Sequence, residues 1–207
     1  QLKRRYFSSG LSVIQLISDF FMKKLDNDPR HWEILKSDYL FRRPWLTARR
    51  DCVRLPAGVV NDEYYVLEYP DWVNVIARTK TGEFVFIRQY RHGLGQTAWE
   101  IVAGCIDASD ASPEEAARRE LYEETGYGGG RWRLLTTLAC NASAMNNLTY
   151  CYVAEDVELL SEQHLEPTED IVVHLLSPQE VRQLLSGDEI RQALMAAPLW
   201  RYFSEQQ

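Results

Sequence analysis

The sequence predicts an α+β fold in which short strands outnumber helices. Many short apolar segments are bounded by turn residues, which is typical of β-strands. Only two segments, 113–125 and 178–186, have the features of helices, and each follows a serine and begins with a proline. At 207 residues the chain can hold one mixed domain and an N-terminal extension.

The expected strands begin near residue 32 and are separated by turn-prone residues. Pro56-Ala57-Gly58 separates the second and third, and Lys80-Thr81-Gly82-Glu83 joins a hairpin. One short buried strand is expected to end at Gly104. The expected strands are 32–40, 47–53, 62–67, 73–77, 84–87, 99–102, 132–139, 148–154 and 171–176.

The stronger of the two predicted helices follows Ser112. A serine side chain can accept hydrogen bonds from the free amides of the first turn, and Pro113 suits the first helical position. Glu115 is expected to complete a capping box, and Gly126 ends the helix. The second helix has Ser177 as its expected cap.

Composition limits the class of partner. The net charge of −7 argues against nucleic acid, which needs a concentrated basic face. A phosphorylated small molecule remains compatible, because a bound metal can neutralise it locally. The four cysteines form no C-x-x-C pair and have no histidine at zinc spacing. They indicate buried thiols in a reducing cytoplasm, without disulfides or a zinc site.

The N-terminal segment 1–21 has a basic run followed by a short apolar stretch. It has the outline of a signal peptide, but Asp19 interrupts the apolar run and no convincing cleavage site follows. The stretch is also too short to span a bilayer. We expect an amphipathic helix or upstream sequence, since Met22-Lys23-Lys24 looks like a natural start, and no membrane partner.

Three glutamates gather on one face of the stronger helix. Glu120 and Glu124 are four residues apart, so their Cβ atoms lie about 5–6 Å apart, and Glu123 can join them. Such carboxylates repel one another unless cations neutralise them, and Mg²⁺ takes oxygen ligands. The alternative is a solvated acidic face balanced by Arg118 and Arg119.

The surrounding sequence favours the metal site. Ala103-Gly104, followed by the segment 115–127 with its R-E-L-Y-E-E-T-G-Y ending, resembles the Nudix box. The similarity covers roughly residues 32–185 and is greatest to the ADP-ribose pyrophosphatase branch of the Nudix family. Its other marks are Arg88-Gln89-Tyr90-Arg91, Trp99-Glu100-Ile101-Val102-Ala103-Gly104 and Glu169-Asp170-Ile171.

This resemblance implies a fold and an assembly. The fold would be a mixed β-sheet sandwiched between helices, α/β/α, with an N-terminal β extension. Residues 1–31 would be an extension, 32–70 strands that mediate homodimerisation, and 71–207 the Nudix hydrolase domain. The protein would be cytoplasmic.

The implied activity is Mg²⁺-dependent hydrolysis of a pyrophosphate bond, with Mn²⁺ as a possible substitute. ADP-ribose, cleaved to AMP and ribose 5-phosphate, is the leading substrate. One alternative is a nucleotide sugar such as GDP-mannose, because specificity depends on pocket shape. Another is a Nudix-like domain that senses a nucleotide without cleaving it.

The resemblance also assigns roles to residues of the box. Glu120 and Glu124 would bind Mg²⁺ directly, with Glu123 sharing an ion or lying in its outer shell. The carbonyl of Ala103 would add a ligand. Arg119 would hold the helix carboxylates in position through ion pairs.

Residues outside the box complete the implied site. Glu169 would accept the proton of the attacking water, and Arg91 would clamp the diphosphate, because guanidinium groups match phosphate oxygens. Arg88, Tyr90 and Glu100 are further substrate-binding candidates. A solvated strand charge is an equal explanation for Arg88, and a core or interface position is the commoner explanation for the aromatic Tyr90.

The chain departs from the box in one place. The segment from Gly104 to Arg119 is one residue longer than the family pattern, so the usual glutamate position falls on Asp110 or Ala111. A bulged turn is expected to absorb the extra residue, since loops tolerate length changes at small entropic cost. Asp110 is expected to substitute in part for the missing glutamate.

Overall fold

The computed structural model describes residues 30–43 and 45–206. The expectations for residues 1–21 lie outside this part of the chain. The chain divides into two compact units. One contains the stretch up to Leu40 together with Arg49–Tyr65, and the other contains Phe41–Ala48 together with Val66–Gln207.

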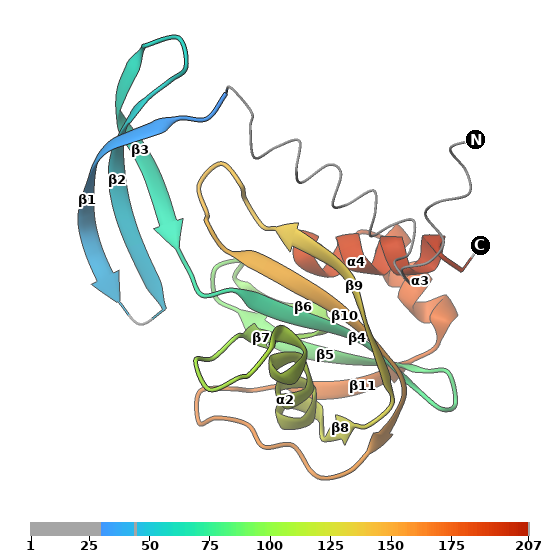
Figure 1. The fold of residues 1–207 in the computed structure, drawn as a ribbon. Coiled ribbons are helices and arrows are strands. Elements are labelled where there is room, and N and C mark those ends of the chain that lie inside the picture. The colour runs from blue at the N-terminus through green and yellow to red at the C-terminus, as the bar shows by residue number, and fades with distance from the viewer. Residues whose placement is uncertain (1–29, 44, 207) are drawn as a thin grey trace, which may run out of the picture. The chain divides into compact units, whose positions relative to one another are not determined.

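Three N-terminal strands form a sheet of their own, in the order β1-β2-β3 (Figure 1). The strands are β1 (Glu33–Arg43), β2 (Leu46–Arg54) and β3 (Val60–Glu68). The turn between β2 and β3 contains Gly58 at φ +85°, a conformation that glycine adopts without a steric penalty. Large apolar side chains of β1 are exposed, among them Ile34, Leu40 and Phe41.

The second sheet has eight strands and is mixed. Its path runs β11-β5-β4-β10-β8, while β6 pairs with β5, β7 with β4 and β9 with β10. The β4–β10 pair is parallel, and the other pairings are antiparallel. The strands are β4 (Trp72–Thr79), β5 (Phe84–Arg91), β6 (Gln96–Glu100), β7 (Val102–Cys105), β8 (Tyr127–Gly128), β9 (Arg131–Ala139), β10 (Leu148–Leu159) and β11 (Val172–Leu176).

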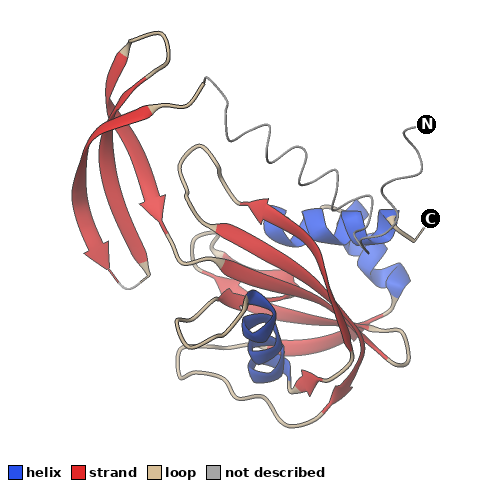
Figure 2. Ribbon diagram, viewed as in Figure 1, coloured by secondary structure: helices blue, strands red, loops and turns tan. Residues whose placement is uncertain are grey.

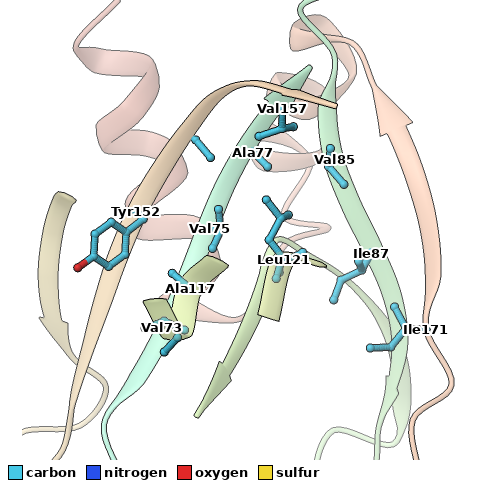
Figure 3. Close-up of a cluster of buried hydrophobic side chains, with 13 residues drawn as sticks. Val73, Val75, Ala77, Val85, Ile87, Ala117, Leu121, Tyr152, Val157 and Ile171 are labelled. Carbon is cyan, nitrogen blue, oxygen red and sulfur yellow. The ribbon is translucent and has the colours of Figure 1, made fainter. Parts of the chain in front are cut away.

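Helices cover both faces of this sheet (Figure 2). On one face α2 (Pro113–Thr125) buries Leu121 against strand residues such as Val75 and Ile87 (Figure 3). On the other face α3 (Pro178–Ser186) and α4 (Ala193–Ser204) pack on a second cluster around Phe86. The predicted α+β fold, with a mixed sheet between helices, is confirmed.

The expected strand 99–102 is in fact two strands. β6 pairs with β5, whereas β7 pairs with β4, so the chain changes partner at Ile101. No turn residue separates the two strands, so the local pattern did not reveal the change. The break places Glu100 and Ala103 on strands with different neighbours.

Helix α2 has the predicted bounds and the predicted Ser112 cap, but it lacks the reciprocal bond of a capping box. The Ser112 side chain accepts a hydrogen bond from the Glu115 amide at 3.2 Å. The Glu115 carboxylate accepts from the amide of Ala111, not of Ser112, so the predicted capping box is wrong. Gly126, at φ +74°, ends the helix. A Cβ there would meet the Ser161 carbonyl oxygen at 2.1 Å.

The sequence analysis missed helix α4. Pro198 lies inside it and removes the amide that would bond to the carbonyl four residues earlier. That carbonyl, on Leu194, instead accepts a 2.6 Å hydrogen bond from Asn74 Nδ2 of β4. A tertiary contact, invisible in the local pattern, therefore compensates for the proline.

The cysteines are all free thiols, but they are not all buried. Cys151 is buried, Cys52 and Cys105 are half-buried, and Cys140 is exposed. The prediction of four buried thiols is wrong because Cys140 follows the end of β9, where the chain enters an exposed loop. No helix in the described part of the chain is long and apolar enough to cross a membrane.

We expect Leu121→Ala to destabilise the protein by about 2–4 kcal/mol, because it opens a cavity under α2. Leu121 is 0% exposed. Urea unfolding monitored by circular dichroism measures the change. Leu134→Ala, at a site that is 50% exposed, is the matched control and should cost less than about 1 kcal/mol. Equal losses in the two variants would contradict this account of the core.

Candidate active site

A cavity of about 280 Å³ lies where β7, α2 and the loop between β10 and β11 meet. Its lining is strongly acidic and includes most of the predicted catalytic set. The lining residues of β7, α2 and these loops are Ala103, Gly104, Cys105, Asp107, Arg119, Glu120, Glu123, Glu124, His164, Glu166 and Glu169.

Arg119 lies at the centre of the charged side chains. Its Nε and Nη2 atoms donate to the two oxygens of Asp110, at 3.1 and 3.0 Å. Its Nη1 atom donates to Glu120 at 2.9 Å and to Glu123 at 3.0 Å, and Nη2 also donates to the Cys105 carbonyl. Arg119 thereby connects the loop to the helix, and the bonds to Asp110 raise its pKa most.

The shifted carboxylate of the loop thus reaches the box arginine. The Asp110 side chain is 7% exposed and also accepts a hydrogen bond from the Asp107 amide at 2.8 Å. These bonds, led by the one from Arg119, lower the Asp110 pKa. The additional residue in the loop has been absorbed without loss of the arginine–carboxylate pair.

Two glutamates of α2, Glu120 and Glu124, are largely shielded from solvent. Burial raises the pKa of Glu120 to about 7, despite the opposing effect of Arg119. Glu124 is 4% exposed, and burial together with the charges of Glu120 and Glu169 raises its pKa well above the ordinary range. Within residues 30–43 and 45–206, Glu124 Oε2 has no hydrogen-bond partner. A buried carboxylate oxygen without a partner favours binding a cation.

Gly104 makes room for the Glu120 carboxylate. A Cβ at position 104 would lie 2.0 Å from Glu120 Cδ and 2.1 Å from its Oε1. Such contacts are impossible, so a side chain here would displace the carboxylate. The glycine of the box is therefore needed to let the helix carboxylate approach β7.

These residues fit a hard divalent cation. Glu120, Glu123 and Glu124 supply carboxylate oxygens, the ligands that Mg²⁺ prefers, and the unpaired Glu124 oxygen is available to it. In the described chain no three His, Cys, Asp or Glu side chains are already gathered as a metal cluster. Arg119 occupies oxygens of Glu120 and Glu123, so these carboxylates would have to turn toward the ion.

Half-buried Arg91 forms an ion pair with the buried Glu100. Arg91 Nε donates to Glu100 Oε1 at 2.8 Å, and its Nη2 contacts Oε2, while the Glu100 side chain is 0% exposed. Hydrogen bonding to Glu100 raises the Arg91 pKa, and the charge of Glu124 adds to this effect. Glu100 therefore orients the guanidinium group of Arg91 near the acidic cavity.

Two other predicted substrate-binding residues lie elsewhere. Arg88 and Tyr90 line a separate hollow with Asp170 and His174. The Arg88 guanidinium lies over the Trp99 ring at 4.9 Å, and Tyr90 is 57% exposed. The structure does not bring them to the acidic cavity, and their substrate role stays a prediction.

The loop between β10 and β11 brings Glu169 to the cavity. Glu169 Oε2 accepts a hydrogen bond from the Glu166 amide at 2.8 Å. Gln163 Nε2 donates to the Glu124 carbonyl at 2.7 Å, and the His164 amide donates to the Glu123 carbonyl at 2.8 Å. The loop is thus attached to the end of α2, which sets the position of Glu169.

Sequence reasoning missed His164 and Gln163. His164 is exposed, yet it lines the acidic cavity and stacks on Tyr122, with ring centroids 5.3 Å apart. Neither residue has a motif or spacing that signals this position. Only the path of the loop past the end of α2 (Figure 1) brings them there.

Family comparison agrees with this geometry. A model described as "NUDIX domain" matches residues 68–197, more than half of the chain, and "Nucleoside diphosphate sugar hydrolase N-terminal domain" matches residues 32–67. The chain belongs to the Nudix hydrolase family. The prediction that the protein is a Nudix-type enzyme is confirmed.

Individual relatives support the same assignment. An ADP-ribose pyrophosphatase of Mycobacterium tuberculosis is 28% identical over 81% of this chain and 82% of its own length. An ADP-ribose pyrophosphatase of Bacillus subtilis is 28% identical over 70% of this chain and 77% of its own length. The crystal structure of an ADP compounds hydrolase has the same fold, with a TM-score of 0.73 and 23% identity, covering 84% of this chain and 92% of that one.

The raised pKa of Glu120 predicts a pH-dependent stability. Without metal, the folded protein binds protons at Glu120 between its ordinary pKa of 4.5 and about 7, where the unfolded chain has lost them. Stability should therefore fall as pH rises through this window. We expect the Tm of the chelator-treated protein to decrease from pH ~5 to ~8, and Mg²⁺ to remove the decrease.

Thermal unfolding with and without Mg²⁺ measures this effect. Glu120→Gln is the control, because glutamine does not titrate, and its decrease should be smaller. A decrease of equal size in this variant, or one that Mg²⁺ leaves unchanged, would show that Glu120 is not the responsible group.

Proposed function

We propose that the protein hydrolyses the pyrophosphate bond of a nucleoside diphosphate sugar in the presence of Mg²⁺, with ADP-ribose as the leading substrate. The products would be AMP and ribose 5-phosphate. The observation that carries the proposal is the acidic cavity, in which Arg119 organises carboxylates around the unpaired oxygen of Glu124.

The metal ligands would be Glu120 and Glu124, with Glu123 and the Ala103 carbonyl contributing. Bound Mg²⁺, or Mn²⁺ in its place, supplies charge neutralisation of the diphosphate and a more acidic water. Arg119 keeps the carboxylates close together before an ion arrives, because it pairs with two of them at once. This arrangement limits the repulsion among glutamates on one helix face.

Glu169 would accept the proton of the attacking water. It lines the same cavity as Glu120 and Glu124 but belongs to the loop between β10 and β11. The Glu166 amide holds one of its oxygens at 2.8 Å, which leaves the other to face a water molecule. Because Glu169 lies on a different element from Glu120 and Glu124, it can act as the base without also binding the metal.

Arg91 would bind the diphosphate. A guanidinium group pairs well with phosphate oxygens, and the buried Glu100 fixes its direction. Half-buried Arg91 keeps access to ligand, with 37% of its side chain exposed. Glu100 would thus act on the substrate through Arg91.

Two alternatives differ in what supports them. A nucleotide sugar such as GDP-mannose is favoured by the match of residues 32–67 to the nucleoside diphosphate sugar hydrolase N-terminal domain. A sensor that binds without cleaving was motivated by the altered loop. The position of Asp110 is an argument against a sensor, because the altered loop still places a carboxylate next to Arg119.

A hydrolysis screen tests the function. Purified protein is assayed with Mg²⁺ against ADP-ribose, ADP-glucose, GDP-mannose, dinucleoside polyphosphates and NADH. Cleavage of a nucleoside diphosphate sugar to a nucleoside monophosphate supports the proposal. Binding without cleavage would favour the sensor, and cleavage of dinucleoside polyphosphates alone would reject the substrate class.

Glu124→Gln should lower kcat on the preferred substrate by about 100-fold or more while leaving the fold intact. Glutamine keeps the size but removes the charge that a metal ligand needs. Circular dichroism and Tm establish folding, and Glu114→Gln, at the exposed start of α2, is the control. Wild-type turnover by Glu124→Gln at limiting Mg²⁺ would mean that the helix is not the metal site.

We also propose a homodimer formed through residues 32–70. The exposed apolar side chains of β1, including Ile34 and Phe41, support this proposal. Sedimentation should show a dimer at micromolar concentration, and Ile34→Lys combined with Phe41→Lys should shift it to monomer. A wild-type monomer would reject the proposal. The cytoplasmic location stays a prediction.

A further inference from the structure

A second cavity, of about 340 Å³, adjoins the acidic one. It lies between the sheet and the start of α4, and it shares the β7 residues Ala103, Gly104 and Cys105 with the acidic cavity. Arg91 lines its border. For a molecule whose diphosphate lies at β7, this second cavity is the neighbouring space on the α4 face of the sheet.

Three oxygen acceptors on the wall of this cavity are unpaired. Within residues 30–43 and 45–206, no hydrogen bond reaches Asn74 Oδ1, Thr149 Oγ1 or Gln192 Oε1. Asn74 is 0% exposed and Thr149 is 2% exposed. Leaving such groups buried and unpaired destabilises a folded protein, so native proteins usually provide them with a partner. A ligand with hydrogen-bond donors would be that partner.

The direction of the Asn74 amide is fixed by the backbone. Its Nδ2 atom donates to the Leu194 carbonyl at 2.6 Å, and this carbonyl is free because Pro198 has no amide to offer. A carbonyl accepts only from the NH₂ end of the amide, so Oδ1 must be the other, unpaired atom. Asn74 therefore presents an acceptor.

The lining selects a neutral, hydroxylated group. Arg91 is the one charged side chain among the cavity's described lining residues, which disfavours a phosphate deep inside it. Trp72, Leu194 and Met195 supply apolar surface. A sugar ring offers both an apolar C–H face and hydroxyl donors.

The positions of the acceptors favour a sugar over a nucleobase. The three acceptors lie on separate parts of the chain. Asn74 is on β4, Thr149 is on β10, and Gln192 directly precedes α4. Sugar hydroxyls point in several directions from the ring. A base presents its donors in one plane along its edge, which suits acceptors aligned on a single side.

We propose that this cavity binds the sugar of a nucleoside diphosphate sugar, whose hydroxyls donate to Asn74, Thr149 and Gln192. The inference rests on the proposed function and adds the position and chemistry of the group beyond the diphosphate. It makes Thr149 a specificity-determining residue of the substrate.

The test uses Thr149→Val, which removes the hydroxyl and preserves the shape. Two ligands share adenosine diphosphate: ADP-ribose carries the sugar, and the β-methyl ester of ADP lacks it. We measure KM for ADP-ribose and the competitive inhibition constant of the methyl ester. Thr149→Ser keeps the hydroxyl, and Thr137→Val places the same change at an exposed site on β9.

We expect Thr149→Val to raise KM for ADP-ribose by roughly 5- to 10-fold and to leave the inhibition constant of the methyl ester within about 2-fold. Thr149→Ser and Thr137→Val should resemble the wild type. The Tm of Thr149→Val should not fall, because the lost hydroxyl has no protein partner in the described chain.

Equal weakening of both ligands would overturn the inference, since the cavity would then hold the base or serve the fold alone. No change in either ligand would also overturn it, although hydrolysis by the wild type would leave the proposed function standing. If the wild type cleaves no nucleoside diphosphate sugar, the proposed function fails, and the sugar assignment falls with it.

Discussion

The candidate site depends on the burial of several carboxylates close together. Glu120 and Glu124 lie on one helix face, in surroundings that disfavour their charged forms. Arg119 makes this arrangement possible in the absence of an ion, because one guanidinium group bonds to Asp110, Glu120 and Glu123 together. Its five donors in a rigid plane suit this task better than a lysine would.

The packing of α2 on the sheet brings these carboxylates close together. Leu121 anchors one face of α2 in the core, so the glutamates on the neighbouring positions are directed toward β7. Gly104 admits the Glu120 carboxylate at a distance that no other residue would permit. Core packing and site chemistry are thus set by the same thirteen-residue helix.

Much of this could be predicted from local patterns. The bounds of α2 and α3 followed from serine, proline and glycine at their ends, because caps are local features. The acidic face followed from helical spacing. The break at Ile101 could not be predicted, because no turn residue separates the two strands. His164 could not be placed either, since only the tertiary path of its loop brings it to the cavity.

The proline of α4 has a wider consequence. A helix interior normally excludes proline, since it leaves a carbonyl without its donor. Here the Leu194 carbonyl attaches α4 to the middle of the sheet through Asn74. A substitution that restored the helical amide at Pro198 would give that carbonyl a second donor, from within the helix. Because Pro198 has no amide, the Leu194 carbonyl takes its donor from Asn74, and a helix that contains a proline thus keeps a buried amide in a single orientation.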